Sequence, residues 1–454
     1  MIFILTLSGA LMALMAAVEI LHFRRVRRFT FLTAAHALIA AGYCLPAFLL
    51  WFLPGTPWEM GSRGAADPNP WGIRLYLIDL ADHLNLPEGA FVNAGIILFG
   101  AYGSMLVGYF LMRRAPVPPL ISAELPRSWL LIIGFGLGIA ATVAMAVYAS
   151  QFTGLRNLVD NGIHVRTGNI TVKWGYLQVL AQVGLTAFLI LISGALRLPG
   201  WRKYLVITFA AAVWFVALVR ILHVGGRLEL GAFIFIPVLA LGFLAKSKGH
   251  AIFAFAVVGA AALIVLNTSH SFSHDPLGEI ITILSNMQRA LNDHIVFALA
   301  DFGFPHIVSA HTLTVVPEII GFRYFIDLPL GLAYMLPNFS GVETLPPMIL
   351  SLQVKLLPWI PVDLFSFGYY SLGTLGVLIT FAAFGALLAL FDGWLTESSG
   401  WLGQTLRAAW LFYLPFRLLY ADPYAALQSG FGLIAGTVLI AVLALWAAWR
   451  RRGA

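Results

Sequence analysis

This sequence has almost no cysteine and few charged side chains. It holds one cysteine, Cys44, and charged residues make up 10% of its 454 positions, against about 25% in soluble domains. A single thiol excludes a disulfide framework and a thiolate zinc cluster. With 60% hydrophobic residues and a mean hydropathy of +0.89, so little charge excludes an ordinary soluble enzyme and a disordered chain.

Motifs for nucleotides and metals are also absent. No G-x-x-x-x-G-K-[ST] sequence occurs, and the predicted cytoplasmic connections are too short for a nucleotide-binding domain, which argues against an ATP-driven pump. No His-Glu-x-x-His or Cys-x-x-Cys pattern occurs, so we expect no metal site and no cofactor. The net charge of +7 is attributed to basic residues in cytoplasmic loops, which orient a membrane protein. No nucleic-acid partner is therefore predicted.

Long apolar runs recur through the whole chain. They predict an all-α polytopic membrane protein with about 11 transmembrane helices, forming a single integral membrane domain over residues 1–454. The first run lacks a basic n-region and a small-residue cleavage site, so we expect a span rather than a cleaved signal. The predicted spans are 2–22, 29–53, 91–112, 128–150, 174–196, 204–222, 228–245, 251–267, 363–391, 401–420 and 426–449.

Basic residues orient these spans. The cluster after the first run predicts a cytoplasmic loop, because Lys and Arg resist translocation. We therefore expect an outer N-terminus and a cytoplasmic C-terminus. Three outer segments follow: 54–90, a basic segment at 151–173, and a large one at 268–362 that we expect to form short helices and carry part of the active site. The orienting cluster is Arg24, Arg25, Arg27 and Arg28.

One cationic group closes the sixth span. Arg220, His223 and Arg227 are spaced i, i+3 and i+7, which places them on one helix face. Charges in the hydrocarbon layer are costly unless they are paired or line a wet cavity, so each is a functional candidate. The alternative is that Arg227 pairs with Glu229 while Arg220 snorkels outward.

Two further cationic groups lie toward the outer face. Arg156 and Arg166 of the basic segment suit an anionic lipid-linked substrate, because guanidinium groups bind phosphate oxygens bidentately. The alternative is a solvated loop in which charges pair with Asp160 or with lipid headgroups. Arg417 follows Pro415 near the outer end of the tenth span, where it would serve an anion site unless Asp422 neutralises it.

The large outer segment supplies candidate bases. Neutral histidines and ionised carboxylates can deprotonate an attacking hydroxyl, and this segment offers His306, His311 and Glu318 together with Arg289 and Arg323. A histidine in a loop can equally be an ordinary surface group.

We interpret three polar residues near the first two spans as packing or boundary residues, namely Glu19, His22 and His36.

Short motifs in residues 150–430 carry a family resemblance. The chain resembles the Wzy-type polysaccharide repeat-unit polymerases of bacterial inner membranes and, more distantly, the O-antigen ligases. The large outer segment late in the chain contributes to the likeness. The motifs are Gly225-Gly226-Arg227, Arg166 with Gly175-Tyr176-Leu177, Gly321-Phe322-Arg323-Tyr324, Leu336-Pro337-Asn338, Pro346-Pro347, the glycine-rich run from Ser366 to Gly376, and Arg417.

This resemblance implies a GT-C-type glycosyltransferase without cofactor or metal. It would take a glycan from undecaprenyl diphosphate and transfer it to the non-reducing-end sugar of another lipid-linked unit, at the periplasmic face of the inner membrane. Implied partners are the undecaprenyl-diphosphate-linked oligosaccharide, membrane lipid and a chain-length regulator protein. Developing diphosphate charge would be stabilised by outward arginines, namely Arg166, Arg227, Arg289, Arg323 and Arg417.

The remaining roles and the alternatives follow from the same resemblance and residues. His311 or Glu318 would act as the base, and the secondary site candidates are Arg156, Arg220, His223 and His306. An O-antigen ligase would use the same donor with a lipid A core acceptor. A non-enzymatic lipid or oligosaccharide transporter would use the cations for binding alone, but it has no need of a long outer segment with candidate bases.

Overall fold

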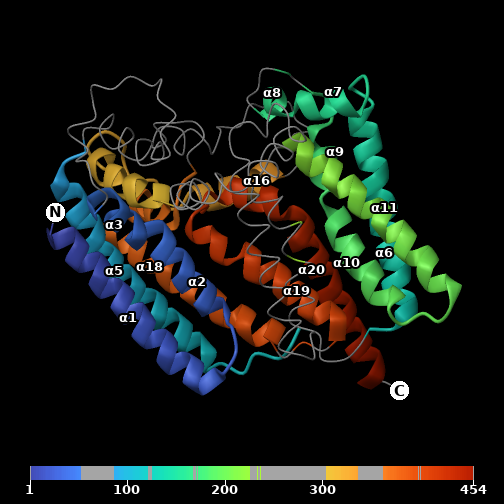
Figure 1. The fold of residues 1–454 in the computed structure, drawn as a ribbon, viewed down its shortest axis with the longest axis horizontal. Coiled ribbons are helices and arrows are strands. Elements are labelled where there is room, and N and C mark those ends of the chain that lie inside the picture. The colour runs from blue at the N-terminus through green and yellow to red at the C-terminus, as the bar shows by residue number, and fades with distance from the viewer. Residues whose placement is uncertain are drawn as a thin grey trace. The chain divides into compact units, whose positions relative to one another are not determined.

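The computed structural model is helical throughout the residues that it describes (Figure 1). Eight helices there are long and apolar enough to cross a membrane, and the described residues contain no β-strand. The prediction of an all-α polytopic membrane protein is confirmed. The seventh and eighth predicted spans, 228–245 and 251–267, lie outside the described residues except at Phe233 and Ile236. The described residues are 2–52, 86–120, 125–166, 170, 172–224, 233, 236, 303–335, 361–396, 398 and 400–452.

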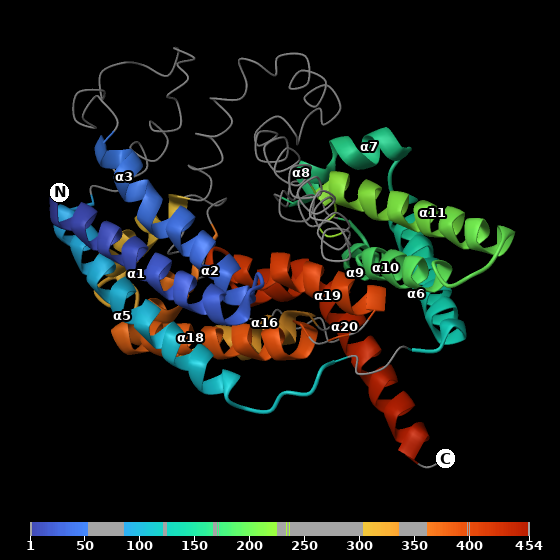
Figure 2. The same ribbon diagram turned by 60° about the horizontal axis from the view of Figure 1, so that its bottom comes forward.

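Contacts divide the chain into two compact units. The first unit comprises residues 1–116, 288–392 and 413–426, and the second comprises 117–287, 393–412 and 427–454. In the first unit, α1 runs beside α5 in both views (Figures 1 and 2). The helices of this unit are α1 (Ile2–Val26), α2 (Phe31–Ile39), the π-helical η1 (Ala40–Cys44), α3 (Leu45–Phe52), α5 (Glu88–Arg113), a helix over 303–315, α16 (Asp327–Met335), most of α18 (Leu364–Thr396) and the 3₁₀ turn η3 (Pro415–Leu418).

Glycines let α5 and α18 approach closely. A Cβ added at Gly108 would collide with the carbonyl oxygen of Ala382, and one added at Gly385 would collide with that of Met105. Because any side chain there would force the two backbones apart, this packing requires glycine at both positions.

The predicted ninth span, 363–391, is not one continuous helix. Leu372 and Gly373 have non-helical backbone angles, and Gly373 has a φ of +60°, which favours glycine. A Cβ at Gly368 would lie 2.7 Å from the Cα of Val377, so the first arm of α18 folds back on the second. The break frees two carbonyl groups: the N–H of Arg323 donates to the carbonyl of Tyr370 at 2.9 Å, and the next N–H donates to the next carbonyl.

The prediction of a single tenth span over 401–420 is wrong. The chain instead forms α19 (Gly400–Tyr413), of 14 residues, followed by η3. A helix of that length rises about 21 Å, short of the roughly 30 Å hydrocarbon layer. Pro415 explains the break, because proline lacks the N–H that would continue the helix.

The second unit is built on α10. This helix packs against α6 and α11, and the three lie together in both views (Figures 1 and 2). The last helix joins them through polar contacts, since the Thr186 hydroxyl donates to the carbonyl of Gly432 at 2.8 Å. The helices of this unit are α6 (Arg127–Ala149), α7 (Leu155–Asp160), α8 (Gly162–Arg166), α9 (Gly175–Leu180), α10 (Val183–Ala195), α11 (Trp201–Val224), most of α19, and α20 (Pro423–Arg452) from residue 427 onward.

Two of the predicted outer segments contain short helices. The basic segment, 151–173, holds α7 and α8, and the large segment, 268–362, is described over 303–335, where it holds the 303–315 helix and α16. The rest of the large segment, and residues 54–85 of the first outer segment, lie outside the described residues.

Candidate functional site

Arg417 is a buried cation in the first unit. The side chain is only 9% exposed, and its Nε and Nη2 have no hydrogen-bond partner among the described residues. The ring of Tyr413 lies against it, with the guanidinium Cζ 4.4 Å from the ring centroid. Asp422 does not pair with Arg417 but caps α20, because its Oδ1 accepts the N–H of Ala425 at 2.8 Å. A desolvated guanidinium with unused donors is suited to bind an anion.

The turn that carries Arg417 is tied to the start of α18. The Tyr43 hydroxyl lies 2.6 Å from Oδ2 of Asp363 and 3.2 Å from the carbonyl oxygen of Leu418, so it can donate to either. Oδ1 of Asp363 has no hydrogen-bond partner among the described residues. Burial raises the pKa of Asp363 to about 6. Sequence analysis missed this carboxyl, although an aspartate directly before an apolar helix is a recognisable cap signal.

His306 lies beside the same tyrosine. Its ring donates to the carbonyl of Tyr43, and its Nε2 has no hydrogen-bond partner among the described residues. Burial lowers the pKa of His306 to about 4, so the imidazole is neutral at physiological pH. A small cavity of about 20 Å³ adjoins it, lined in part by Cys44, Ser8 and Ser309. This volume is enough for about one water molecule.

The two candidate bases lie in different surroundings. His311 is buried in the 303–315 helix, burial lowers its pKa, and its Nδ1 has no hydrogen-bond partner among the described residues. Glu318 is exposed in the turn that follows this helix. Of these two side chains, only the Glu318 carboxylate is exposed.

Arg323 is engaged within the chain. Its Nε and Nη2 donate to the two carboxylate oxygens of Asp327, at 3.0 and 2.5 Å. Asp327 is buried and also hydrogen-bonds the side chain of Tyr370. Two of the donors predicted for diphosphate are therefore already used, which gives Arg323 a structural role at the reversal of α18.

The secondary candidates of the second unit are partnered. Arg156 is exposed and pairs with Asp160 at 3.6 Å, which is the alternative that the sequence left open. The Nε of Arg220 donates to the carbonyl of Gln178 at 3.1 Å. His223 bonds the carbonyl of Leu158 at 2.6 Å and the Tyr148 hydroxyl at 2.8 Å. Arg220 and His223 therefore tie α11 to α9, α7 and α6.

Three predicted diphosphate ligands cannot be placed. Arg227 and Arg289 lie outside the described residues, and for Arg166 only the backbone, at the end of α8, is described. Of the described candidates, Arg323, Arg417, His306, His311 and Glu318 belong to the first unit, whereas Arg156, Arg220 and His223 belong to the second.

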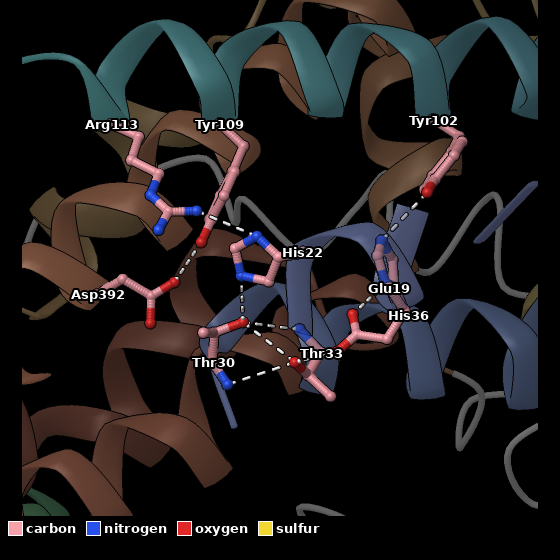
Figure 3. Close-up of polar contacts among 9 residues, drawn as sticks. All are labelled: Glu19, His22, Thr30, Thr33, His36, Tyr102, Tyr109, Arg113 and Asp392. Carbon is pink, nitrogen blue, oxygen red and sulfur yellow. Dashed lines mark hydrogen bonds and ion pairs between the residues drawn. The ribbon is translucent and has the colours of Figure 1, made fainter. Parts of the chain in front are cut away.

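A second polar cluster in the first unit was not recognised as one from the sequence. Side chains from four helices and the link before α2 form a hydrogen-bonded network (Figure 3). The signal was present, because acids and histidines in apolar runs are functional candidates by default. The network residues are Glu19, His22, Thr30, Thr33, His36, Tyr102, Tyr109, Arg113 and Asp392.

Fold and side chains together define a polytopic helical membrane protein with buried polar clusters. No group of three or more metal-ligating side chains occurs among the residues that the structure describes. No family model, no curated protein and no solved structure matches the chain.

Proposed function

We propose that this protein is a membrane glycosyltransferase that polymerises lipid-linked oligosaccharide units. The observation that carries the proposal is Arg417, a buried guanidinium with unused donors stacked on Tyr413. A diphosphate leaving group needs preorganised positive charge where its own charge develops. The sequence motifs supply the rest of the argument, and they favour undecaprenyl diphosphate as the carrier.

The reaction requires one bond to break and one to form. The bond between the anomeric carbon and the diphosphate oxygen breaks, and the acceptor hydroxyl oxygen bonds to that carbon. A base, Glu318 or His311, takes the hydroxyl proton, and undecaprenyl diphosphate leaves against Arg417. No cofactor or metal enters this scheme. We place the active site on the periplasmic side of a bacterial inner membrane, with a chain-length regulator protein as partner.

The test is a reaction of the purified full chain in lipid nanodiscs with an undecaprenyl-diphosphate-linked oligosaccharide. We expect polymer on a glycan gel and release of undecaprenyl diphosphate. Arg417→Gln should abolish both, while Arg202→Gln, which changes an exposed arginine of α11, should leave both intact.

Other outcomes would replace the proposal. Transfer only to an added lipid A core acceptor would identify a ligase. Movement of the lipid-linked glycan across the bilayer without a new glycosidic bond would identify a transporter. If Arg417→Gln formed polymer at the wild-type rate, the hypothesis that Arg417 binds the diphosphate would be wrong.

A further inference from the structure

Two helices of the first unit, α1 and α5, end at the same place. A Cβ added at Gly95 of α5 would lie 3.2 Å from Cδ1 of Leu7 in α1. Near the other end, Nη1 of Arg113 lies 3.0 Å from Nδ1 of His22 (Figure 3). The two helices therefore run side by side in the same direction (Figures 1 and 2). Their C-terminal ends meet, and each carries two consecutive arginines there.

Four guanidinium groups besides that of Arg113 lie at this shared end. All four side chains are exposed. Among the residues that the structure describes, none of the four has a side-chain hydrogen bond, an ion pair or a ring contact. They therefore do not bond the free carbonyl groups at the helix ends, and like charges so close together repel one another. We call these residues the arginine cluster: Arg24, Arg25, Arg27 and Arg114.

Arg27 has a backbone conformation that arginine seldom adopts. Its φ is +52°, and its N–H donates to the carbonyl of Phe23 at 2.7 Å, which ends α1. Glycine or asparagine is the usual residue in this left-handed position after a helix, because most side chains are strained there. Strained residues often mark a functional site. A strained arginine without an internal partner in the described chain favours a ligand from outside.

The surface next to the cluster is apolar. One turn before the arginines, Leu21 of α1 is 67% exposed and Leu111 of α5 is 61% exposed, and Phe23 and Phe29 beside the cluster are exposed as well. This combination matches a phospholipid, whose acyl chains lie against apolar helix faces while its phosphate lies at the membrane surface. A soluble phosphate would use the cations alone.

We propose that the arginine cluster binds the phosphate of an anionic phospholipid, whose acyl chains lie on the exposed apolar surface of α1 and α5. Guanidinium groups bind phosphate oxygens bidentately, and basic residues near the membrane surface attract anionic headgroups. A zwitterionic lipid carries the same phosphate together with its own cation, so it fits the cluster less well. The site does not depend on glycosyl transfer.

The test is native mass spectrometry of the purified full chain in detergent micelles. The protein is titrated with phosphatidylglycerol and, separately, with phosphatidylcholine of the same acyl chains, and the bound fraction gives each affinity. We expect the wild type to bind phosphatidylglycerol about 30-fold more tightly or better. Equal affinity for the two lipids overturns the proposal.

Variants from both helices show whether the ends form one site. Arg24→Gln/Arg25→Gln should weaken binding of phosphatidylglycerol by about 30-fold, which is about 1 kcal/mol for each charge removed. Arg114→Gln, on α5, should weaken it by about fivefold for the same reason. Either variant with the wild-type affinity overturns a site shared by the two helices.

The matched control removes the same charge elsewhere. Arg202→Gln/Lys203→Gln acts at the start of α11 in the second unit and should leave the affinity within about twofold. A loss equal to that of Arg24→Gln/Arg25→Gln would mean that net charge alone attracts the lipid, and it overturns the proposal.

A competition experiment distinguishes a lipid from a soluble phosphate. Glycerol phosphate has the phosphate of the lipid without its acyl chains, so we expect it to displace phosphatidylglycerol only at a large excess. Displacement at equal concentrations would show that the cluster binds phosphate alone, and the assignment of a lipid would be wrong.

Discussion

The ring of Tyr413 lies against the guanidinium of Arg417, with Cζ 4.4 Å from the ring centroid. Tyr413 is in the last turn of α19 and Arg417 is in the 3₁₀ turn that follows, so the break at Pro415 is what brings the two side chains together. An aromatic face stabilises a desolvated cation by about 1–2 kcal/mol. It does so without occupying the hydrogen-bond donors, which stay available to an anion.

Replacing this cation should stop elongation. Arg417→Gln is expected to lower polymer formation by about 100-fold or more, the usual effect of removing a donor that stabilises developing charge. Arg417→Lys keeps the charge but lacks the planar fork, so we expect intermediate activity. The measurement is the initial rate of undecaprenyl diphosphate release, and equal rates in Lys and Gln variants would contradict a role for the charge.

The stacking ring can be tested separately. Tyr413→Phe and Tyr413→Leu both lose the hydroxyl, which bonds the carbonyl of Ala426, but only Leu loses the aromatic face. We expect Leu to lower the elongation rate about fivefold relative to Phe, which corresponds to about 1 kcal/mol. Equal rates in the two variants would mean that the ring does not support the cation.

The choice between the two bases depends on access. Under the proposed function, Glu318→Gln is expected to lower turnover by about 100-fold, because an exposed carboxylate is open to an incoming hydroxyl that it could deprotonate. His311→Gln should act mainly on the temperature of unfolding, because that side chain is buried. Full turnover in both variants, measured with purified lipid-linked units, would exclude both residues as the base.

The pair of Arg323 and Asp327 should be structural. Arg323→Ala leaves a buried carboxylate without its counter-charge and is expected to cost about 3 kcal/mol. Unfolding can be followed by reaction of a fluorogenic maleimide with Cys44, the only cysteine and a buried one. The double variant Arg323→Ala/Asp327→Ala should be less destabilised than the sum of the single variants, and strict additivity would show that the pair is not coupled.

Asp363 should make stability depend on pH. Burial raises its pKa to about 6, above about 3.9 in an unfolded chain. The folded state therefore holds this proton more tightly, and the contribution that favours folding is present below about pH 4 and lost as the pH rises through about 6. Asp363→Asn keeps an acceptor for Tyr43, so its unfolding temperature should exceed that of the wild type at about pH 8, and the difference should shrink toward about pH 4. A difference that is independent of pH would contradict the burial of an ionising carboxyl.

Close packing of α5 on α18 can be tested with two glycines of α5, one at the contact and one away from it. A methyl group at Gly108 collides with the backbone of α18, whereas one at Gly103 meets nothing within 4 Å. Gly108→Ala is expected to destabilise the protein by about 1–3 kcal/mol, and Gly103→Ala by less than about 0.5. The maleimide assay measures both, and equal effects would contradict the helix contact.

Apolar run length predicted most of the described spans, because crossing a bilayer needs a fixed length of apolar helix. The span predictions were wrong where the backbone breaks inside an apolar run that is long enough to cross the bilayer. At Gly373 the chain of the ninth predicted span breaks and folds back on itself, and at Pro415 the helix of the tenth predicted span ends. Both residues are visible in the sequence, but apolar run length does not register the backbone break that either introduces.

Among the site residues, the sequence singled out Arg417 as a candidate anion ligand, and the structure shows that its side chain is buried. The sequence could not say whether Asp422 neutralises it. The structure decides that question, since Asp422 caps α20 instead. The sequence also grouped Arg323 with the diphosphate ligands, because its partner Asp327 becomes buried only when α16 packs in the first unit. Pairing of charges depends on side-chain positions that spacing alone does not fix.

Composition and apolar periodicity alone determined that this is a polytopic helical membrane protein, because the bilayer sets the length and the polarity of every span. Only the tertiary structure joined Glu19, His36 and Tyr102 into one network and left Arg417 with unused donors. The physical reason is that hydrogen bonds and ion pairs act over a few ångströms, between residues that the chain separates by tens or hundreds of positions.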